Sequence, residues 1–226
     1  MNPNNTEVHL GFEDEHLVIA WKPHGVLTSG NSGRTFVQAV NRCLDKASES
    51  GVLPCHRLDF GTSGWVVFGK NKSAAREMGL LFEQRSINKR YVALVHGQVP
   101  PSLNMVWPLD GKFAKTRVAM LAQGRMAGTG PVSFVHAEPI TGRTHQIRRH
   151  LFDSGHGIVG DDRYGIPGER YQGKGLFLCA YGMNFDHPLT SDLKVNLVAE
   201  PSKKFRKLPF VHQSDFIQRL SLSSHR

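Results

Sequence analysis

Four short runs of apolar residues predict buried strands. Each run is nearly continuous rather than alternating, which is typical of a strand with both faces covered. The first run is followed by Lys22-Pro23-His24-Gly25, a sequence that favours a turn. In chain order the runs are Leu17–Trp21, Trp65–Phe68, Tyr91–Val95 and Val132–Ala137.

Two further stretches have the spacing of amphipathic helices. Between Thr35 and Leu44, apolar residues recur three and four positions apart, which predicts a helix with one buried face. Ser73 is a candidate N-cap for a second helix that ends near Gln84. Its buried face would consist of Ala74, Ala75, Met78, Leu81 and Phe82.

Residues 100–130 interrupt this pattern. They are rich in Gly, Pro, Lys and Arg, so we expect an irregular, mobile basic loop there. Residues 1–7 are expected to be frayed. Short strands mixed with a few helices indicate an α+β domain built around a sheet. We expect residues 1–226 to form this single domain.

Composition narrows the choice of partner. The chain has 226 residues and a formal net charge of +9, which favours an anionic partner, nucleic acid before a membrane surface. No stretch approaches the roughly 20 apolar residues of a spanning helix, and the first ten residues do not resemble a secretory signal. Three widely separated cysteines indicate a reducing cytoplasm. The spacing of His145, His150 and His156 does not favour a zinc site.

Two segments place single polar groups beside predicted strands. Asp59 precedes the Trp65–Phe68 run, where a rigid strand could support a functional carboxylate. An ordinary turn is the alternative, because Asp, Gly, Thr and Ser are common in turns. Tyr91 opens its strand behind Lys89 and Arg90, and its alternative is a tyrosine at the edge of the core with its hydroxyl in water.

Three arginines surround the start of a third predicted helix. This helix covers 144–153, and Gly155 would end it. Positive side chains at a helix start have the wrong sign for the helix dipole unless a carboxylate or phosphate is near, which favours an anion site. Ile147 and Leu151 can anchor the helix in the core, so the charge of Arg148 would need a partner. The three residues are Arg143, Arg148 and Arg149.

Together these segments closely resemble the motifs of the RluA-type pseudouridine synthases. The motifs occur in the family's order and span residues 22 to about 200. The aspartate motif and the arginine-helix motif are the most specific. The matching segments are Lys22-Pro23-x-Gly25, His56-Arg57-Leu58-Asp59-x-x-Thr62-Ser63-Gly64, Lys89-Arg90-Tyr91, Gly142-Arg143-Thr144-His145-Gln146-Ile147-Arg148, Gly160-Asp161-x-x-Tyr164-Gly165 and His187-Pro188-x-Thr190.

The resemblance implies a fold and a reaction. The fold would be a mixed, largely antiparallel sheet in two halves with a central catalytic cleft. The reaction would convert uridine in RNA to pseudouridine with no cofactor and no metal: uracil leaves C1′, rotates and is reattached through C5. One carboxylate suffices because the base stays bound, whereas a glycosidase needs a second carboxyl group to protonate a departing oxygen.

The resemblance also implies roles for individual residues. Asp59 would act at C1′, either by covalent attack or by taking the 2′ proton. Arg148 would pair with Asp59 and keep it ionised. Tyr91 would stack near the base and assist loss of the C5 proton. Arg57 would fill the place vacated by a flipped uridine. The expected RNA-binding residues are Arg57, Arg143, His145, Gln146, Lys112, Lys115, Arg117 and Arg125.

Some positions depart from the family. Cys179 stands where a histidine is usual, which we expect to tune packing, and an aromatic residue usual after Thr116 is absent. No room before residue 10 remains for the small extra RNA-binding domain of some relatives. The segments Phe82–Tyr91 and Arg148–Leu151 most resemble those of family members that modify transfer RNA, and this resemblance favours transfer RNA over large-subunit ribosomal RNA as substrate. We expect a cytoplasmic monomer.

Two other functions compete with this interpretation. One is a hydrolase that uses Asp59 and a histidine, although no serine or cysteine nucleophile motif supports it. The other is a catalytically silent RNA-binding or RNA-folding module. Its mark would be the loss of Asp59, Tyr91 or Arg148, and all three are present.

Overall fold

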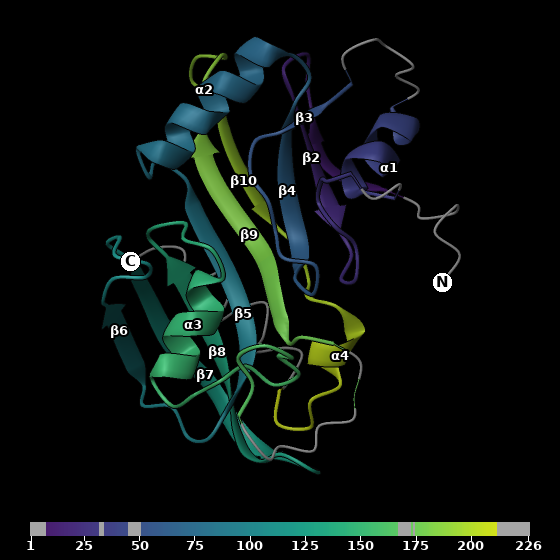
Figure 1. Cartoon of the computed structure of the whole chain (residues 1–226). Coiled ribbons are helices and arrows are strands. Elements are labelled where there is room, and N and C mark those ends of the chain that lie inside the picture. Colours follow the sequence, from purple (N-terminus) through teal and green to yellow (C-terminus); the bar gives the residue numbers. More distant parts are fainter. Residues whose placement is uncertain (1–7, 32–33, 45–50, 167–172, 174, 212–226) are drawn as a thin grey trace. The chain divides into compact units, whose positions relative to one another are not determined.

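The computed structural model describes residues 8–31, 34–44, 51–166, 173 and 175–211 (Figure 1). The expected frayed end at residues 1–7 lies outside them. The chain divides into two compact units: unit 1 is Met1–Asn88 with Gly182–Leu197, and unit 2 is Lys89–Tyr181 with Val198–Arg226.

The strands of unit 1 are built on the first two predicted apolar runs. β1 (His9–Glu13), β2 (Leu17–Lys22) and β4 (Ser63–Gly69) pair antiparallel in that order, and the short β3 (Leu53–Pro54) pairs with β4. Every residue of β4 is buried, which explains its continuous apolar run. Both predicted strands are therefore confirmed.

Among the described residues, unit 1 contains two helices. α1 (Phe36–Cys43) confirms the first prediction, and the backbone N–H of its N-cap Thr35 donates to Gln38 Oε1 at 3.1 Å. α2 (Lys72–Glu83) packs against β4 and β3. The predicted N-cap Ser73 is wrong by two residues, because Asn71 Oδ1 accepts the N–H of Ala74 at 2.8 Å and so caps the helix. Ala74 and Met78 form the fully buried part of its inner face.

Unit 2 is built on antiparallel strands in the order β5-β8-β7-β6. Their bounds are Asn88–His96 for β5, Ser102–Val106 for β6, Lys115–Met126 for β7 and Gly130–Pro139 for β8. β5 and β8 contain the other two predicted runs. β9 (Leu178–Asp186) and β10 (Lys194–Val198) each contribute residues to both units, as does β5.

Unit 2 has two helices in the part of the chain that the structure describes. α3 (Gln146–Asp153) packs on β7 and β8 (Figure 1), and α4 (Lys203–Arg206) is a single turn. Ile147 and Leu151 of α3 are buried, as predicted, and Gly155 follows its end with a positive φ of 80°. The predicted start at 144 is wrong by two residues, because His145 is left-handed (φ 53°) and precedes the first helical residue.

The prediction of an irregular, mobile loop over residues 100–130 is wrong. β6 and β7 pair through five registered positions from Ser102↔Ala119 to Val106↔Lys115. β7 also pairs with β8 along its length. Thr116 and Val118 are buried, whereas Arg117 and Ala119 are exposed, so the segment has the inward and outward alternation of a strand. The basic residues here are therefore mounted on a sheet and on the turn before it.

The mostly antiparallel strands and few helices confirm the predicted fold class. Among the helices in the described residues, none is long and apolar enough to cross a membrane.

Candidate functional site

Asp59 lies in the loop between β3 and β4, shortly before β4 begins. Its carbonyl oxygen accepts the N–H of Thr62 at 3.0 Å. On the preceding residue, Leu58, the N–H and the C=O are both hydrogen-bonded to Thr28 Oγ1 at 3.1 Å. Asp59 is half-buried, whereas Phe60 is 58% exposed. The loop thus holds its carboxylate on a backbone that is fixed at both sides.

The turn after β2 supports this loop. The N–H of Gly25 donates to the carbonyl oxygen of Phe60 at 2.7 Å. Lys22 is fully buried, and its Nζ donates to the carbonyl oxygens of Pro23 (3.0 Å) and Val26 (2.7 Å). Burial lowers the pKa of Lys22 to about 8, and the charge of Asp59 acts in the opposite direction. The Lys-Pro-x-Gly motif therefore brings a buried cation to the aspartate loop.

Cys55 and His56, just before Asp59, have structural roles. Burial raises the pKa of the Cys55 thiol to about 12, which keeps it protonated and unreactive. His56 Nε2 accepts the N–H of Val67 at 3.1 Å, and its ring lies 4.7 Å from that of Phe82. This geometry gives the alternative hydrolase neither a thiolate nucleophile at Cys55 nor a free base at His56.

Tyr91 lies near the start of β5 in unit 2. It is half-buried and stands opposite Ala137 of β8. Its neighbour Arg90 is buried and points to the other face of the sheet, 6.0 Å from the ring of Tyr181. On that face burial, together with the charge of Arg90, lowers the pKa of His136 to about 4. Tyr91 is thus separated from this polar cluster by the sheet.

Arg148 leaves α3 and binds Asp161. Its Nε and Nη2 donate to the two carboxylate oxygens at 2.7 and 2.8 Å, and both residues are buried. Burial alone would raise the pKa of Asp161, but hydrogen bonds from Arg148 and from the backbone N–H of Tyr164 offset it, so the pKa is lowered. The guanidinium also lies 5.1 Å from the Tyr164 ring. Unit 2 therefore supplies a carboxylate partner for Arg148 in Asp161, for which no role was predicted, and the expected pairing with Asp59 stays a prediction.

Gly165 makes the turn that carries Asp161 possible. A side-chain carbon at this position would collide with the carbonyl oxygen of Asp161. Tyr164 of the same turn approaches His145, with its hydroxyl 3.2 Å from Nδ1. The Gly160-Asp161-x-x-Tyr164-Gly165 segment is thus the mount for the Arg148 carboxylate partner.

Gln146 is buried at the first turn of α3, and its amide group is used internally. Oε1 accepts from Thr141 Oγ1 (2.6 Å) and from the N–H of Arg143 (2.9 Å). Nε2 donates to the carbonyl oxygen of Lys115 (2.9 Å) and to Thr116 Oγ1 (3.0 Å). Both amide hydrogens are occupied, so Gln146 fixes β7 to α3. This geometry gives no support to the predicted contact between Gln146 and RNA.

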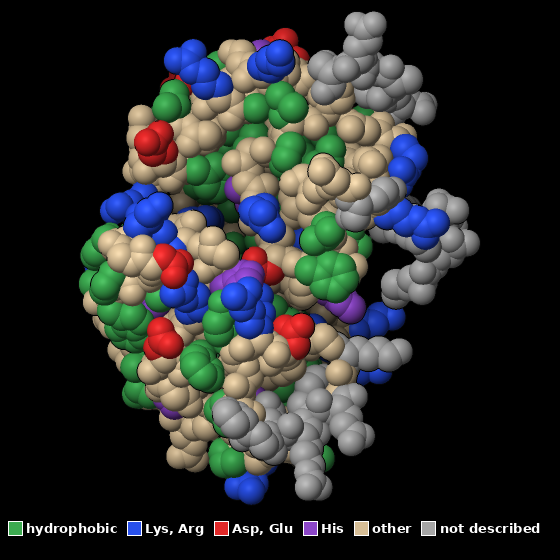
Figure 2. All heavy atoms as spheres, viewed as in Figure 1, with side chains coloured by type: hydrophobic (Ala, Val, Ile, Leu, Met, Phe, Trp, Pro, Cys, Tyr) green, Lys and Arg blue, Asp and Glu red, His purple; other side chains and the backbone are tan. Residues whose placement is uncertain are grey.

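The other predicted RNA-binding residues are at least partly exposed. Lys112 is exposed in the turn before β7, and Arg117 and Arg125 are exposed on β7 itself. Arg143, half-buried, donates from Nε to the carbonyl oxygen of Phe113 at 3.0 Å. The space-filling view has basic side chains interspersed with acidic and apolar ones around α3 (Figure 2), and Arg149 there is paired with Asp110 at 2.7 Å. The basic side chains of unit 2 are therefore distributed over its surface, and acidic side chains neutralise some of their charge.

Sequence reasoning missed two residues of the site. Asp161 belonged to a recognised motif, but no role was predicted for it. Lys22 was interpreted as part of a turn and of a family motif, again without a role of its own. The signal in each case was a charged residue in a segment of small and apolar residues. Within the described part of the chain, no cluster of three or more His, Cys, Asp or Glu side chains could hold a metal ion.

The sequence matches one protein family, described as RNA pseudouridylate synthase, over residues 16–152. This range contains Asp59, Tyr91 and Arg148. The ribosomal large subunit pseudouridine synthase C of Vibrio parahaemolyticus is 34% identical over 87% of this chain and 67% of its own length. The dual-specificity RNA pseudouridine synthase RluA of Haemophilus influenzae is 33% identical over 80% of this chain and 88% of its own length.

The chain spans between 61% and 67% of the length of four similar synthase C proteins. Two solved human structures share the fold. RNA pseudouridylate synthase domain containing 1 gives a TM-score of 0.76 at 23% identity and covers 95% of both chains. RNA pseudouridylate synthase domain containing 4 gives 0.69 at 22% identity and covers 88% of this chain and 90% of its own.

Proposed function

Because this chain belongs to the RNA pseudouridylate synthase family, and within it to the RluA type, we propose that it converts uridine to pseudouridine in structured RNA. The observation that carries the proposal is the mounting of Asp59. Its carboxylate is half-buried, its loop is fixed by backbone hydrogen bonds, and a buried strand follows at once. Such a rigid support is what a catalytic carboxylate requires.

The proposed reaction is an isomerisation that needs neither a cofactor nor a metal. The C1′–N1 bond breaks, uracil rotates, and a C1′–C5 bond forms. The C5 proton then leaves and N1 ends protonated, so atoms and charge balance. Asp59 would act at C1′, where positive charge develops, or at the 2′ proton. Both routes need an ionised carboxylate in a defined position.

Tyr91 and Arg148 are the other proposed site residues. Tyr91 is half-buried on the rigid strand β5, and its ring would lie near the uracil and assist loss of the C5 proton. The guanidinium of Arg148 is held in place by Asp161. The pairing of Arg148 with Asp59 stays a prediction.

RNA binding would use base flipping and phosphate contacts. A uridine inside a folded RNA must leave its stack before its C1′ can be reached. Arg57 is exposed two residues before Asp59, where it could occupy the vacated position. The exposed cations of unit 2, Lys112 and Arg125 among them, would bind phosphates.

We propose a general class of substrate RNA and, within it, two candidate RNA types. Structured RNA is the general substrate. Motif likeness favours transfer RNA, whereas similar proteins are named for the ribosomal large subunit or as dual-specificity enzymes. Both RNA classes therefore belong in the assay.

The test is tritium release from RNA that carries uridine labelled at C5. Transcripts of transfer RNA and of large-subunit ribosomal RNA would be incubated with the full chain. Release that equals pseudouridine formed supports the enzyme, and the RNA that reacts identifies the substrate class. RNA binding without release from either pool would contradict the proposal and indicate a silent RNA-binding module.

A further inference from the structure

We propose that Lys22 is a positioning residue for Asp59: its buried ammonium group supplies, from within unit 1, a positive charge that stabilises the Asp59 carboxylate. This inference rests on the proposed function. It assigns a role in the reaction to the first residue of the Lys-Pro-x-Gly segment, for which the sequence analysis gives a turn and a motif match but no function.

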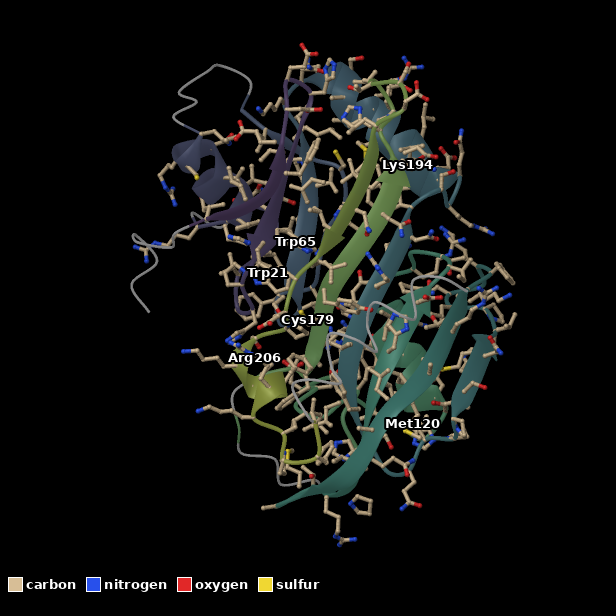
Figure 3. The ribbon with its side chains drawn as sticks, turned by 180° about the vertical axis from the view of Figure 1, so that it is seen from behind. Trp21, Trp65, Met120, Cys179, Lys194 and Arg206 are labelled. Carbon is tan, nitrogen blue, oxygen red and sulfur yellow. The ribbon has the colours of Figure 1, made fainter. Side chains whose placement is uncertain are left out.

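The geometry of β2 directs Lys22 inward. Successive side chains of a strand face opposite sides, and the preceding Trp21 packs edge-on against Trp65, 5.1 Å between ring centres (Figure 3). Lys22 therefore points to the other face. The residue opposite it on β4 is Gly64, which carries no side chain. The result is an ammonium group with no solvent exposure.

The bonds of Nζ are made to neutral groups. It donates to the carbonyl oxygens of Pro23 and Val26, which satisfy two of its three hydrogens. Neutral acceptors leave the charge itself uncompensated, and an uncompensated buried charge is costly. A carboxylate is the expected partner.

Asp59 is the carboxylate that fits this position. The turn that holds Nζ is tied to the Asp59 loop by the bond from Gly25 N–H to the carbonyl oxygen of Phe60, 2.7 Å. The charge of Asp59 also raises the pKa of Lys22 against the larger effect of burial, with a final value of about 8. Lys22 is thus mostly charged at neutral pH and loses its proton just above it.

Other ionisable groups near these two loops do not replace Asp59. His24 and Arg57 are exposed to solvent. His56 accepts a hydrogen bond from β4 through Nε2. On β1, Glu13 is paired with Lys70 at 2.6 Å. The interaction between Lys22 and Asp59 is therefore specific to this turn and loop.

Neutralising Lys22 should slow the chemical step rather than weaken RNA binding. A buried lysine has no contact with solvent and so cannot serve as a phosphate contact. Its effect passes through Asp59, which must be ionised at the start of each turnover. We expect Lys22→Met to lower kcat by about tenfold or more, which corresponds to ~1.4 kcal/mol in the barrier, with little change in RNA affinity.

The experiment compares wild type, Lys22→Met and Lys204→Met by tritium release at saturating RNA, from pH 6.5 to 9.5. Lys204 is a matched control, because burial also lowers its pKa to about 8 but it lies in unit 2 beside Phe177. Wild type and Lys204→Met should lose kcat as the pH rises through about 8. The Lys22→Met variant should have a low kcat that does not fall further as the pH rises through about 8.

Three results would overturn the inference. One is a Lys22→Met variant with wild-type kcat, another is the same fall of kcat with rising pH in wild type and variant, and the third is a wild-type kcat that stays flat through pH 8. If Lys22→Met does not fold, Lys22→Gln replaces it, since its amide can still donate hydrogen bonds without carrying a charge. An inactive wild type on every RNA would instead contradict the proposed function.

Discussion

The Arg148 guanidinium and the Asp161 carboxylate form two parallel hydrogen bonds, 2.7 and 2.8 Å long, inside unit 2. Backbone N–H groups of Arg163 and Tyr164 donate to the same carboxylate. A buried pair with this geometry fixes the direction of the arginine and leaves each member dependent on the other. The orientation of Arg148 therefore depends on a residue outside its own motif.

Arg148→Leu should destabilise the protein strongly at neutral pH. Asp161 would remain buried without its partner, at a cost of roughly 3–5 kcal/mol. Arg148→Lys should recover part of this loss but not the paired geometry, because the planar fork is absent. Urea denaturation at pH 7 measures both.

The loss of stability in Arg148→Leu should depend on pH in a defined direction. In wild type the lowered pKa of Asp161 means that its contribution is present above about pH 4 and is lost only as the pH falls further. In Arg148→Leu, burial without a partner should raise the pKa of the Asp161 carboxyl. The loss of unfolding free energy relative to wild type should therefore become smaller as the pH is lowered from 7 to 4. Arg149→Leu is the control, since Arg149 makes a similar pair with the exposed Asp110. Equal effects of both variants would contradict the account.

Lys22→Met should change how stability depends on alkaline pH. The folded protein releases the Lys22 proton near pH 8, whereas the unfolded chain keeps it to about 10.5. Wild type therefore gains stability between these values, by roughly 3 kcal/mol for such a shift, and the variant lacks this gain. Urea titrations at pH 7.5 and 10 are made in a Trp107→Phe background, so that the fluorescence of the remaining Trp21 and Trp65 reports on unit 1. A wild-type-to-variant difference that is constant with pH would be evidence against the buried charge.

Single cations of unit 2 should differ in their contribution to RNA binding. Lys112→Ala and Arg125→Ala should each lower the salt slope of RNA affinity by roughly one. Arg117→Ala should lower it less, because Arg117 stands opposite Glu138 and acts on its charge. Lys70→Ala, in a surface pair with Glu13, is the control. Equal slopes for all four variants and wild type would exclude phosphate contacts at these positions.

The strands were predictable where both of their faces are buried. Leu17–Trp21 and Trp65–Phe68 are continuous apolar runs because neither side reaches solvent. The strand β7 was missed because one of its buried positions, Thr116, is polar and its exposed positions include Arg117 and Arg125. The residue types along β7 therefore do not alternate between apolar and polar, although its side chains do alternate between buried and exposed positions.

Candidate site residues were identifiable from the sequence where a local motif contains the whole signal, as for Asp59 and Arg148, whose roles stay predictions. The partners were not. Asp161 bonds Arg148 through a separate turn, and Lys22 acts on a loop that is far from it in sequence. Burial creates both interactions, and burial at these positions exists only after the chain has folded. Gln146 illustrates the same limit, because its four bonds reach residues that precede it.

The central claim is that Asp59 performs chemistry while other residues hold the RNA. Its most direct test is Asp59→Asn, a change that removes the charge and keeps the size of the side chain. Tritium release from RNA labelled at uridine C5 measures turnover, and filter binding measures affinity. The account predicts no product, with RNA affinity within about tenfold of wild type, that is ~1.4 kcal/mol. Appreciable tritium release by the Asn variant would contradict it.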